Sequence, residues 1–250
     1  MAILITGGSG VLGRELKKVF LDALVPTRKE LDITDCVQVS DYISEYKPKI
    51  IIHTAALTNV RLCEIDRPLA FKTNVLGTRN IVQTLQALSL DCYLVFISTA
   101  CVFRGDVGNY DEQDLPYPKN YYSLTKHLAE FEVYRYRKVF PLIIRTNFVG
   151  RTEWKYPRAF TDRFGTYLFA DDVALAVEQV IASKIYGLVH VCGDQKMSMF
   201  DLAKINTQDV QPMTMEDYEI ENMFVNVPEL TVDMSLTSKR IKPFRLRRKI

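Results

Sequence analysis

Three residues of this chain have side chains that could together assist the reduction of a carbonyl group by a hydride donor: Thr99, Tyr122 and Lys126. Hydride transfer to a carbonyl carbon leaves negative charge on its oxygen, so a proton donor is needed there. We expect Tyr122 to be that donor, with the ammonium of Lys126 lowering the pKa of its phenol from about 10. Lys126 would also bind the ribose of a nicotinamide cofactor, and the Thr99 hydroxyl would position the carbonyl oxygen.

Two predicted elements would bring these residues together. Tyr122 and Lys126 lie in a predicted helix over residues 121–138, where a separation of four places both side chains on one face. Ser98 and Thr99 follow the apolar run 92–97, which predicts a strand buried on both faces. We expect Ser98 to contact the cofactor. The Tyr-x-x-x-Lys spacing alone is weak evidence, because a half-buried tyrosine and a solvated lysine on an amphipathic helix would share it.

The first thirteen residues predict a site for the diphosphate of a dinucleotide. An apolar run, residues 2–5, predicts a strand, and glycines at G-x-x-G-x-x-G spacing separate it from an amphipathic helix. Such a turn lets a diphosphate approach the backbone and directs the unpaired N–H groups of the helix toward it. We expect cofactor contacts from Gly7, Gly10, Val11 and Leu12. The alternative is a tight turn that binds nothing.

The residues after a second predicted strand, 23–25, favour NADP over NAD. An acidic side chain at this place would bind the 2′-hydroxyl of NAD, whereas Arg28 and Lys29 suit the 2′-phosphate of NADP. NAD stays an alternative, as does a pair of solvated surface cations. A third predicted strand, residues 49–53, leads to Ala55 and Ala56, whose small side chains leave room for the cofactor.

Strands and helices alternate along the first 150 residues. A strand at 141–145 completes the series, with helices at 35–46, capped by Thr34, and from Asp66 past Leu88. Continuously apolar strands in such an alternation indicate an α/β fold with a doubly wound parallel sheet, the Rossmann fold. We expect residues 1–150 to form an NADP-binding domain. Residues 151–250 would form a small, shortened substrate-binding region interleaved with the last sheet elements.

Composition excludes several classes of partner. A net charge of +2 gives no reason to expect nucleic acid, and no apolar run approaches the length of a membrane span. Without a leader-like segment we expect a cytoplasmic protein with no membrane partner; a homodimer is compatible with the sequence. The five cysteines and three histidines lack metal-ligand spacing, so we expect reduced thiols and no metal.

Opposite charge blocks mark the C-terminal part. Residues 207–230 are acidic and read as a loop, and the last dozen residues are basic. The basic residues are Lys239, Arg240, Lys242, Arg245, Arg247, Arg248 and Lys249. We expect a solvated terminal segment, although such a tail could also bind RNA or the phosphates of a sugar nucleotide.

Several ordered motifs resemble those of the extended short-chain dehydrogenases/reductases that act on nucleotide sugars, most closely the dTDP-4-dehydrorhamnose reductases. Over residues 1–150 they are ILITGGSGVLG, LDITD, IIHTAALTNV, FISTACVF, NYYSLTK and IIRTNFVG. The resemblance implies NADPH-dependent reduction of the 4-keto group of a nucleotide-linked 6-deoxy sugar, in dTDP-rhamnose biosynthesis. It implies catalytic roles for Thr99, Tyr122 and Lys126, and cofactor contacts from the glycine turn, Asp32, Ile33, Ala55 and Ala56.

The sequence departs from these reductases in the substrate region. Ala100 and Cys101 replace the usual Asp-Tyr pair, and they cannot serve as the Asp-Glu pair of the related dehydratases. Cys101 resembles the epimerising cysteine of GDP-fucose synthases, although no histidine occurs between residues 151 and 189; a buried thiol is the simpler interpretation. Only RTEWKYPRAFT separates Gly150 from Asp162, which shortens the pocket roof. Side chains there that could bind a base and a diphosphate, or form a surface contact, are Trp154, Tyr156, Arg158 and Phe160.

Two alternative functions follow from these departures. One is a non-catalytic, NADP-binding regulatory subunit resembling methionine adenosyltransferase subunit β. The other is a 3,5-epimerase/4-reductase of a nucleotide sugar, which would need Cys101 as a base.

Overall fold

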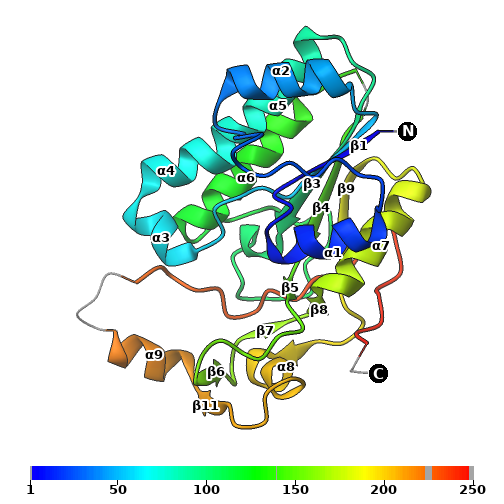
Figure 1. Ribbon diagram of the computed structural model, residues 1–250. Helices are drawn as coiled ribbons and strands as arrows, with labels where there is room; N and C mark the ends of the chain where they lie inside the picture. The colour runs from blue at the N-terminus through cyan, green and yellow to red at the C-terminus, as the bar shows by residue number, and fades with distance from the viewer. Residues whose placement is uncertain (1, 139, 223–226, 248–250) are drawn as a thin grey trace.

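A parallel sheet of five strands forms the centre of the computed structural model, which describes residues 2–138, 140–222 and 227–247 (Figure 1). In spatial order the strands are β1 (Ile3–Thr6), β2 (Ile50–His53), β3 (Tyr93–Thr99), β4 (Leu142–Thr146) and β9 (Gly187–Val191). All neighbours pair in parallel. The predicted strand at 23–25 is reduced to a single bridge between Leu24 and Leu4.

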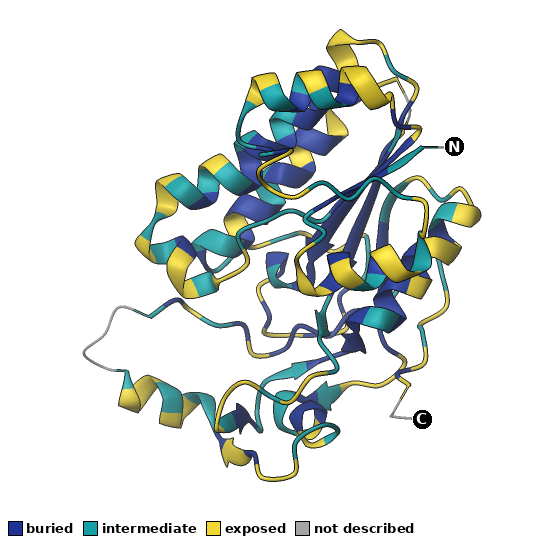
Figure 2. Ribbon diagram, in the orientation of Figure 1, coloured by how far each residue is buried: buried dark blue, intermediate teal, exposed yellow. Residues whose placement is uncertain are grey.

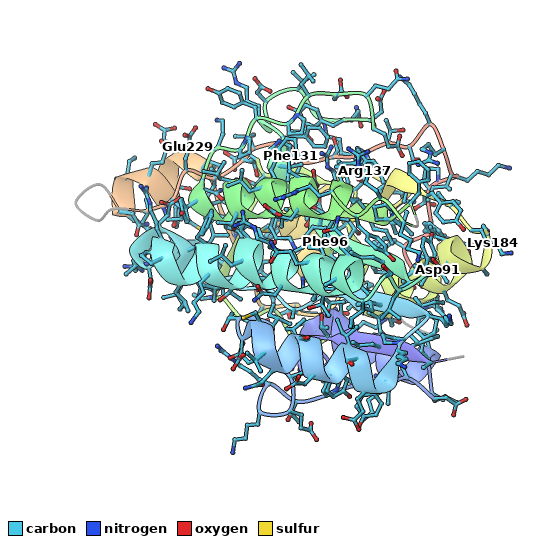
Figure 3. All side chains as sticks on the ribbon, turned by 90° about the horizontal axis from the view of Figure 1, so that it is seen from above. Asp91, Phe96, Phe131, Arg137, Lys184 and Glu229 are labelled. Atoms are coloured by element: carbon cyan, nitrogen blue, oxygen red, sulfur yellow. The ribbon has the colours of Figure 1, made fainter. Side chains whose placement is uncertain are left out.

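Helices cover both faces of this sheet, as a doubly wound fold requires (Figure 1). Against one face pack α1 (Val11–Val19) and α7 (Ala170–Ala182). Against the other pack α2 (Cys36–Tyr46), α5 (Gly77–Ala87) and α6 (Tyr121–Tyr134), which lie side by side when seen from above (Figure 3). The strands are buried on both sides (Figure 2), which explains their continuous apolar sequences. The predicted α/β fold class is confirmed.

The long helix predicted from Asp66 is interrupted by a π-helical turn. Asp66 caps α4 (Arg67–Phe71), and the segment η1 (Lys72–Leu76) then has π-helical hydrogen bonding before α5 begins. In η1, the Asn74 side chain accepts from Leu57 N at 2.7 Å and donates to Leu57 O at 3.0 Å and to Thr125 Oγ1 at 2.9 Å. Asn74 therefore joins the loop after β2 to helix α6. A further short helix, α3 (Val60–Ile65), was not predicted.

Helix α2 begins at a different cap from the one expected. Asp35, rather than Thr34, accepts hydrogen bonds from Val37 N and Gln38 N, which are free N–H groups of the first turn. The helix ends where Lys47 adopts a left-handed conformation with φ +43°.

Short elements of the C-terminal region lie beyond the carboxyl ends of the central strands (Figure 1). They are the strand pairs β5 (Phe148–Val149) with β8 (Leu168–Phe169), β6 (Arg158–Phe160) with β11 (Gln211–Met213) and β7 (Phe164–Gly165) with β10 (Met197–Ser198), and helices α8 (Met199–Lys204) and α9 (Met215–Glu221). Since β11 and α9 lie within 207–230, the expectation of a loop there is wrong in part. The division into domains at residue 150 stays a prediction.

The basic end of the chain contacts the rest of the protein at several residues, and its described basic side chains are exposed, as expected of a solvated segment. Lys239 Nζ lies 2.6 Å from Asp111 Oδ2, Arg240 donates to Tyr186 O at 2.7 Å, and Leu246 is buried. Arg247 pairs with Asp171 and Asp172 at the start of α7. Lys239 and Arg247 thus have acidic partners within the chain. Arg248 and Lys249 lie outside the described residues.

Over the same described ranges, no helix combines the length and apolar character needed to cross a bilayer. Nor does this part of the chain group three or more His, Cys, Asp or Glu side chains so that they could hold a metal ion.

Candidate active site

A cavity of about 700 Å³ opens at the carboxyl ends of β1 to β4. It extends from the glycine turn after β1 to the short elements of the C-terminal region. Apart from Lys29, the residues expected to act in catalysis or cofactor binding all line it: Gly7, Gly10, Val11, Leu12, Arg28, Asp32, Ile33, Ala55, Ala56, Ser98, Thr99, Tyr122 and Lys126. The structure therefore brings the proposed site together in one place, as expected for an open α/β sheet.

The glycine turn has the shape of an anion-binding loop. Gly7 has φ +76°, and a Cβ there would lie 2.6 Å from Ala55 N, so only glycine lets the two loops pass this closely. Helix α1 begins at Gly10 with no side-chain cap. Because the N–H groups of its first turn border the cavity without a capping partner, they fit the diphosphate of a dinucleotide.

Arg28 and Asp32 line the part of the cavity where the adenosine ribose of the cofactor is expected. Arg28 Nε lies 3.1 Å from Asp32 Oδ2, and Asp32 Oδ1 accepts from Thr34 N at 2.9 Å. Partial burial opposes ionisation of Asp32, but these hydrogen bonds outweigh it and lower the pKa of the carboxyl. Lys29 is not among the residues that line the cavity, so only one of the two predicted cations borders it.

Thr99, Tyr122 and Lys126 converge where β3 meets α6. The Thr99 hydroxyl accepts from Cys101 N at 3.1 Å, and it is close enough to the Tyr122 phenol to lower the pKa of that group. One helical turn further along α6, Lys126 Nζ donates to Ile97 O at 2.8 Å and lies 4.0 Å from the centre of the Phe96 ring. Seen from above, Phe96 appears between α5 and α6 (Figure 3). A reacting carbonyl could therefore meet a hydroxyl, a phenol and an ammonium in one place.

The protonation equilibria of this site differ from the expectation. Burial raises the pKa of Tyr122, and this effect is larger than the lowering that the nearby Thr99 hydroxyl causes. Burial also lowers the pKa of Lys126 to about 7, against an opposing effect of Glu130. In this geometry Lys126 does not lower the pKa of the phenol, because its ammonium is directed at Ile97 O. Tyr122 is therefore protonated at neutral pH and can donate.

A buried ion pair between Glu130 and Arg145 lies next to the site. On Glu130, Oε1 accepts from Ser98 Oγ at 2.5 Å and from Arg145 Nε at 2.9 Å, and Oε2 accepts from Arg145 Nη2 at 2.7 Å. Burial alone would raise the pKa of Glu130, but Arg145 outweighs it and the pKa is about 2. Glu130 thus links α6 to β3 and β4 beside Thr99, Tyr122 and Lys126.

We expect Glu130→Gln to destabilise the protein by about 3–5 kcal/mol, because it leaves the Arg145 guanidinium buried without a countercharge. The unfolding free energy from urea titration measures this. The matched control is Glu15→Gln, which breaks the exposed Lys18–Glu15 pair and should cost less than about 1 kcal/mol. Equal stabilities for the two variants would contradict the prediction.

The substrate end of the cavity differs from the sequence-based expectation. Of the short aromatic and basic loop, only Tyr156 lines the cavity. Trp154 Nε1 donates to Arg158 O at 3.1 Å, Arg158 pairs with Glu221, and Phe160 packs on Tyr218. These three side chains therefore stabilise the C-terminal region instead of contacting a ligand.

The sequence did not identify several other residues at this end, because their motifs carry no obvious chemistry. They are Thr146, Asn147, Arg163, Tyr167, Met199 and Met234. Cys101 also lines the cavity and is partly exposed, with Sγ 3.3 Å from Met234 Sδ, so the expectation of a buried thiol is wrong. Among the described cavity-lining residues none is a histidine, which leaves Cys101 without the partner that an epimerase would need.

Comparisons with known proteins point in one direction. Residues 1–155 match the family described as the RmlD substrate binding domain. The chain is 30% identical over 234 residues to a dTDP-4-dehydrorhamnose reductase of Aggregatibacter actinomycetemcomitans, covering 80% of this chain and 76% of the relative. The structure of dTDP-4-dehydrorhamnose reductase from Bacillus anthracis in complex with NADP superimposes with a TM-score of 0.80 at 27% identity, covering 94% and 90% of the two chains. Methionine adenosyltransferase 2 subunit beta of Xenopus laevis is 26% identical over 233 residues, covering 80% and 69%.

Proposed function

Because the chain belongs to the RmlD substrate binding domain family, within the extended short-chain dehydrogenases/reductases, we propose that it is an NADPH-dependent reductase of the 4-keto group of a nucleotide-linked 6-deoxy sugar. One observation supports this most: Thr99 and Tyr122, with Lys126 one helical turn away, line the same cavity as the glycine turn. Thr99, Tyr122 and Lys126 are the proposed catalytic residues.

The proposed mechanism uses these groups as follows. When bound, NADPH supplies the hydride that adds to the carbonyl carbon. Thr99 holds the carbonyl oxygen by a hydrogen bond, and Tyr122 gives that oxygen the proton that completes the alcohol. The phenolate left on Tyr122 regains a proton from solvent, and Lys126 would bind the ribose of the nicotinamide. The first turn of α1 binds the diphosphate, and Ser98, Ala55 and Ala56 form the cavity wall along the dinucleotide.

The direct test is to supply the purified protein with NADPH and a dTDP-linked 4-keto-6-deoxyhexose. We expect NADPH to be consumed in step with formation of the 4-hydroxy sugar. With NADPH deuterated at its transferable position, the label should appear at C4 of the product. Binding of NADPH without turnover of dTDP-, UDP- or GDP-linked 4-keto sugars would contradict the proposal.

Arg28 gives a test of cofactor choice. We expect Arg28→Ala to lower the preference for NADPH over NADH about tenfold or more, because it removes the cation at the 2′-phosphate end of the cavity. The dissociation constants of both cofactors measure this. Lys29→Ala is the matched control and should leave the preference unchanged, since Lys29 does not line the cavity. An unchanged ratio in Arg28→Ala would remove Arg28 from the phosphate site.

A regulatory subunit is the second candidate. It is favoured by the 26% identity to methionine adenosyltransferase 2 subunit beta and by Ala100 and Cys101 at the substrate end. This alternative expects NADP binding without sugar reduction, and a stable partner that copurifies with the tagged chain. Turnover of any sugar nucleotide would count decisively against it.

A further inference from the structure

Three polar atoms at the substrate end of the cavity have no hydrogen-bond partner among the described residues: Thr146 Oγ1, Asn147 Nδ2 and the Tyr167 hydroxyl oxygen. All three residues line the cavity. Thr146 is only 2% exposed and Tyr167 only 1%. Since buried polar groups are almost always paired in folded proteins, we take these atoms as the mark of a ligand that supplies partners.

Two of these side chains lie close together, and the third lies beside Thr99. Gly165 brings two of them together: a Cβ there would be 2.7 Å from Tyr167 Cζ and 3.0 Å from Asn147 Nδ2. Thr146 is the register partner of Thr99 across β3 and β4. The cluster therefore lies one strand away from the hydroxyl that is proposed to hold the carbonyl oxygen.

Tyr167 faces the substrate side of the cavity and is held in place. Burial raises the pKa of Tyr167, with smaller effects from the charges of Arg163, Cys101 and Asp233, which also lie at the substrate end. Next to it, the Thr166 hydroxyl binds both Leu236 O and Leu236 N, and Gly193 N donates to Thr166 O at 3.0 Å. The Tyr167 ring packs with Phe169, Leu202 and Leu246. Its hydroxyl is thus a fixed hydrogen-bonding group, as specificity requires.

We propose that Tyr167, Asn147 and Thr146 form a subsite that binds the 2- and 3-hydroxyl groups of the sugar, of which the 3-hydroxyl is next to the keto carbon. This inference rests on the proposed function. Two hydroxyls that can donate or accept, together with one amide donor, match a pair of neighbouring sugar hydroxyls, which also donate and accept. A sugar lacking one of these hydroxyls would leave the subsite unpaired, so Tyr167 acts as a specificity-determining residue.

The test compares wild type with Tyr167→Phe, which removes the hydroxyl and keeps the ring. The substrates are the dTDP-linked 4-keto sugar with both ring hydroxyls and its 3-deoxy and 2-deoxy analogues. For the hydroxylated sugar we expect kcat/KM to fall about 5- to 100-fold, mostly through KM, while at least one deoxy analogue loses much less. Affinity for NADPH and the melting temperature should stay unchanged. Tyr186→Phe, an exposed tyrosine at the start of β9, is the matched control.

Three results would overturn the subsite. Equal losses for the hydroxylated sugar and both deoxy analogues would show that the hydroxyl contacts neither ring group. Weaker NADPH binding with unchanged sugar discrimination would assign it to the nicotinamide carboxamide. Wild-type kinetics in the variant would show that the hydroxyl binds a buried water and not the sugar. If the wild-type protein reduces no sugar, the proposed function fails, but the subsite can still be tested by calorimetry with dTDP-rhamnose. Equal affinities of wild type and Tyr167→Phe for dTDP-rhamnose would overturn the subsite.

Discussion

Replacing Tyr122 with phenylalanine is expected to lower kcat/KM for the keto sugar about a hundredfold to ten-thousandfold, the usual range for loss of a positioned general acid. The phenol is the only group in the proposed mechanism that hands a proton to the carbonyl oxygen, and its raised pKa keeps it protonated at neutral pH. Because the ring is retained, NADPH affinity should change less than threefold. Steady-state kinetics and fluorescence titration of NADPH measure the two quantities.

The neighbouring tyrosine provides the control. Tyr121 lies in the same first turn of α6, but it does not line the cavity and stacks on Arg67 instead. Tyr121→Phe should retain wild-type kinetics. If Tyr122→Phe were as active as Tyr121→Phe, another group would have to protonate the substrate, and the proposed mechanism would be abandoned.

Lys126→Met is expected to reduce kcat/KM about 10²- to 10³-fold and to weaken NADPH binding about tenfold. The substitution removes the cation that stabilises charge in the transition state and that would bind the nicotinamide ribose. Methionine keeps a chain of similar length over the Phe96 ring. Isothermal calorimetry with NADPH separates the loss of binding from the loss of rate. Unchanged NADPH affinity would restrict Lys126 to the chemical step.

A second readout for Lys126 needs no substrate. Its pKa is about 7 in the folded protein and near 10.5 in the unfolded chain, so between these pH values only the unfolded chain holds the proton. The unfolding free energy of wild type should therefore rise with pH relative to that of Lys126→Met from pH 7 to pH 10. Other groups titrate in both proteins, and the difference removes them. A difference independent of pH would show that Lys126 is ionised when folded.

Much of the sheet and one half of the site could be predicted from the sequence. The strands are buried on both faces, so their apolar runs were unambiguous, and small or hydroxyl side chains marked their carboxyl ends. Glycines at fixed spacing and the four-residue separation of Tyr122 and Lys126 have local geometric meanings, and local patterns are what a sequence shows directly.

The substrate half could not be predicted in the same way. Its strands are two or three residues long, too short for periodicity, and several pair with partners distant in the chain: Met213 is paired with Phe160, and Gly165 with Met197. Tyr167 and Arg163 reach the cavity only because of that tertiary arrangement. The capping of α2 by Asp35 instead of Thr34 was a smaller error, because either residue could have accepted from the first turn.

Asn74 has a consequence for how this protein can change in evolution. Its amide holds the loop after β2, which lines the cavity, and helix α6, which carries Tyr122 and Lys126. Mutations in that loop therefore disturb reactivity together with nucleotide affinity. Arg28 lies on a separate loop, after the segment paired with β1, outside those hydrogen bonds. Substitutions at Arg28 could thus change the preference between NADP and NAD without altering Thr99, Tyr122 and Lys126.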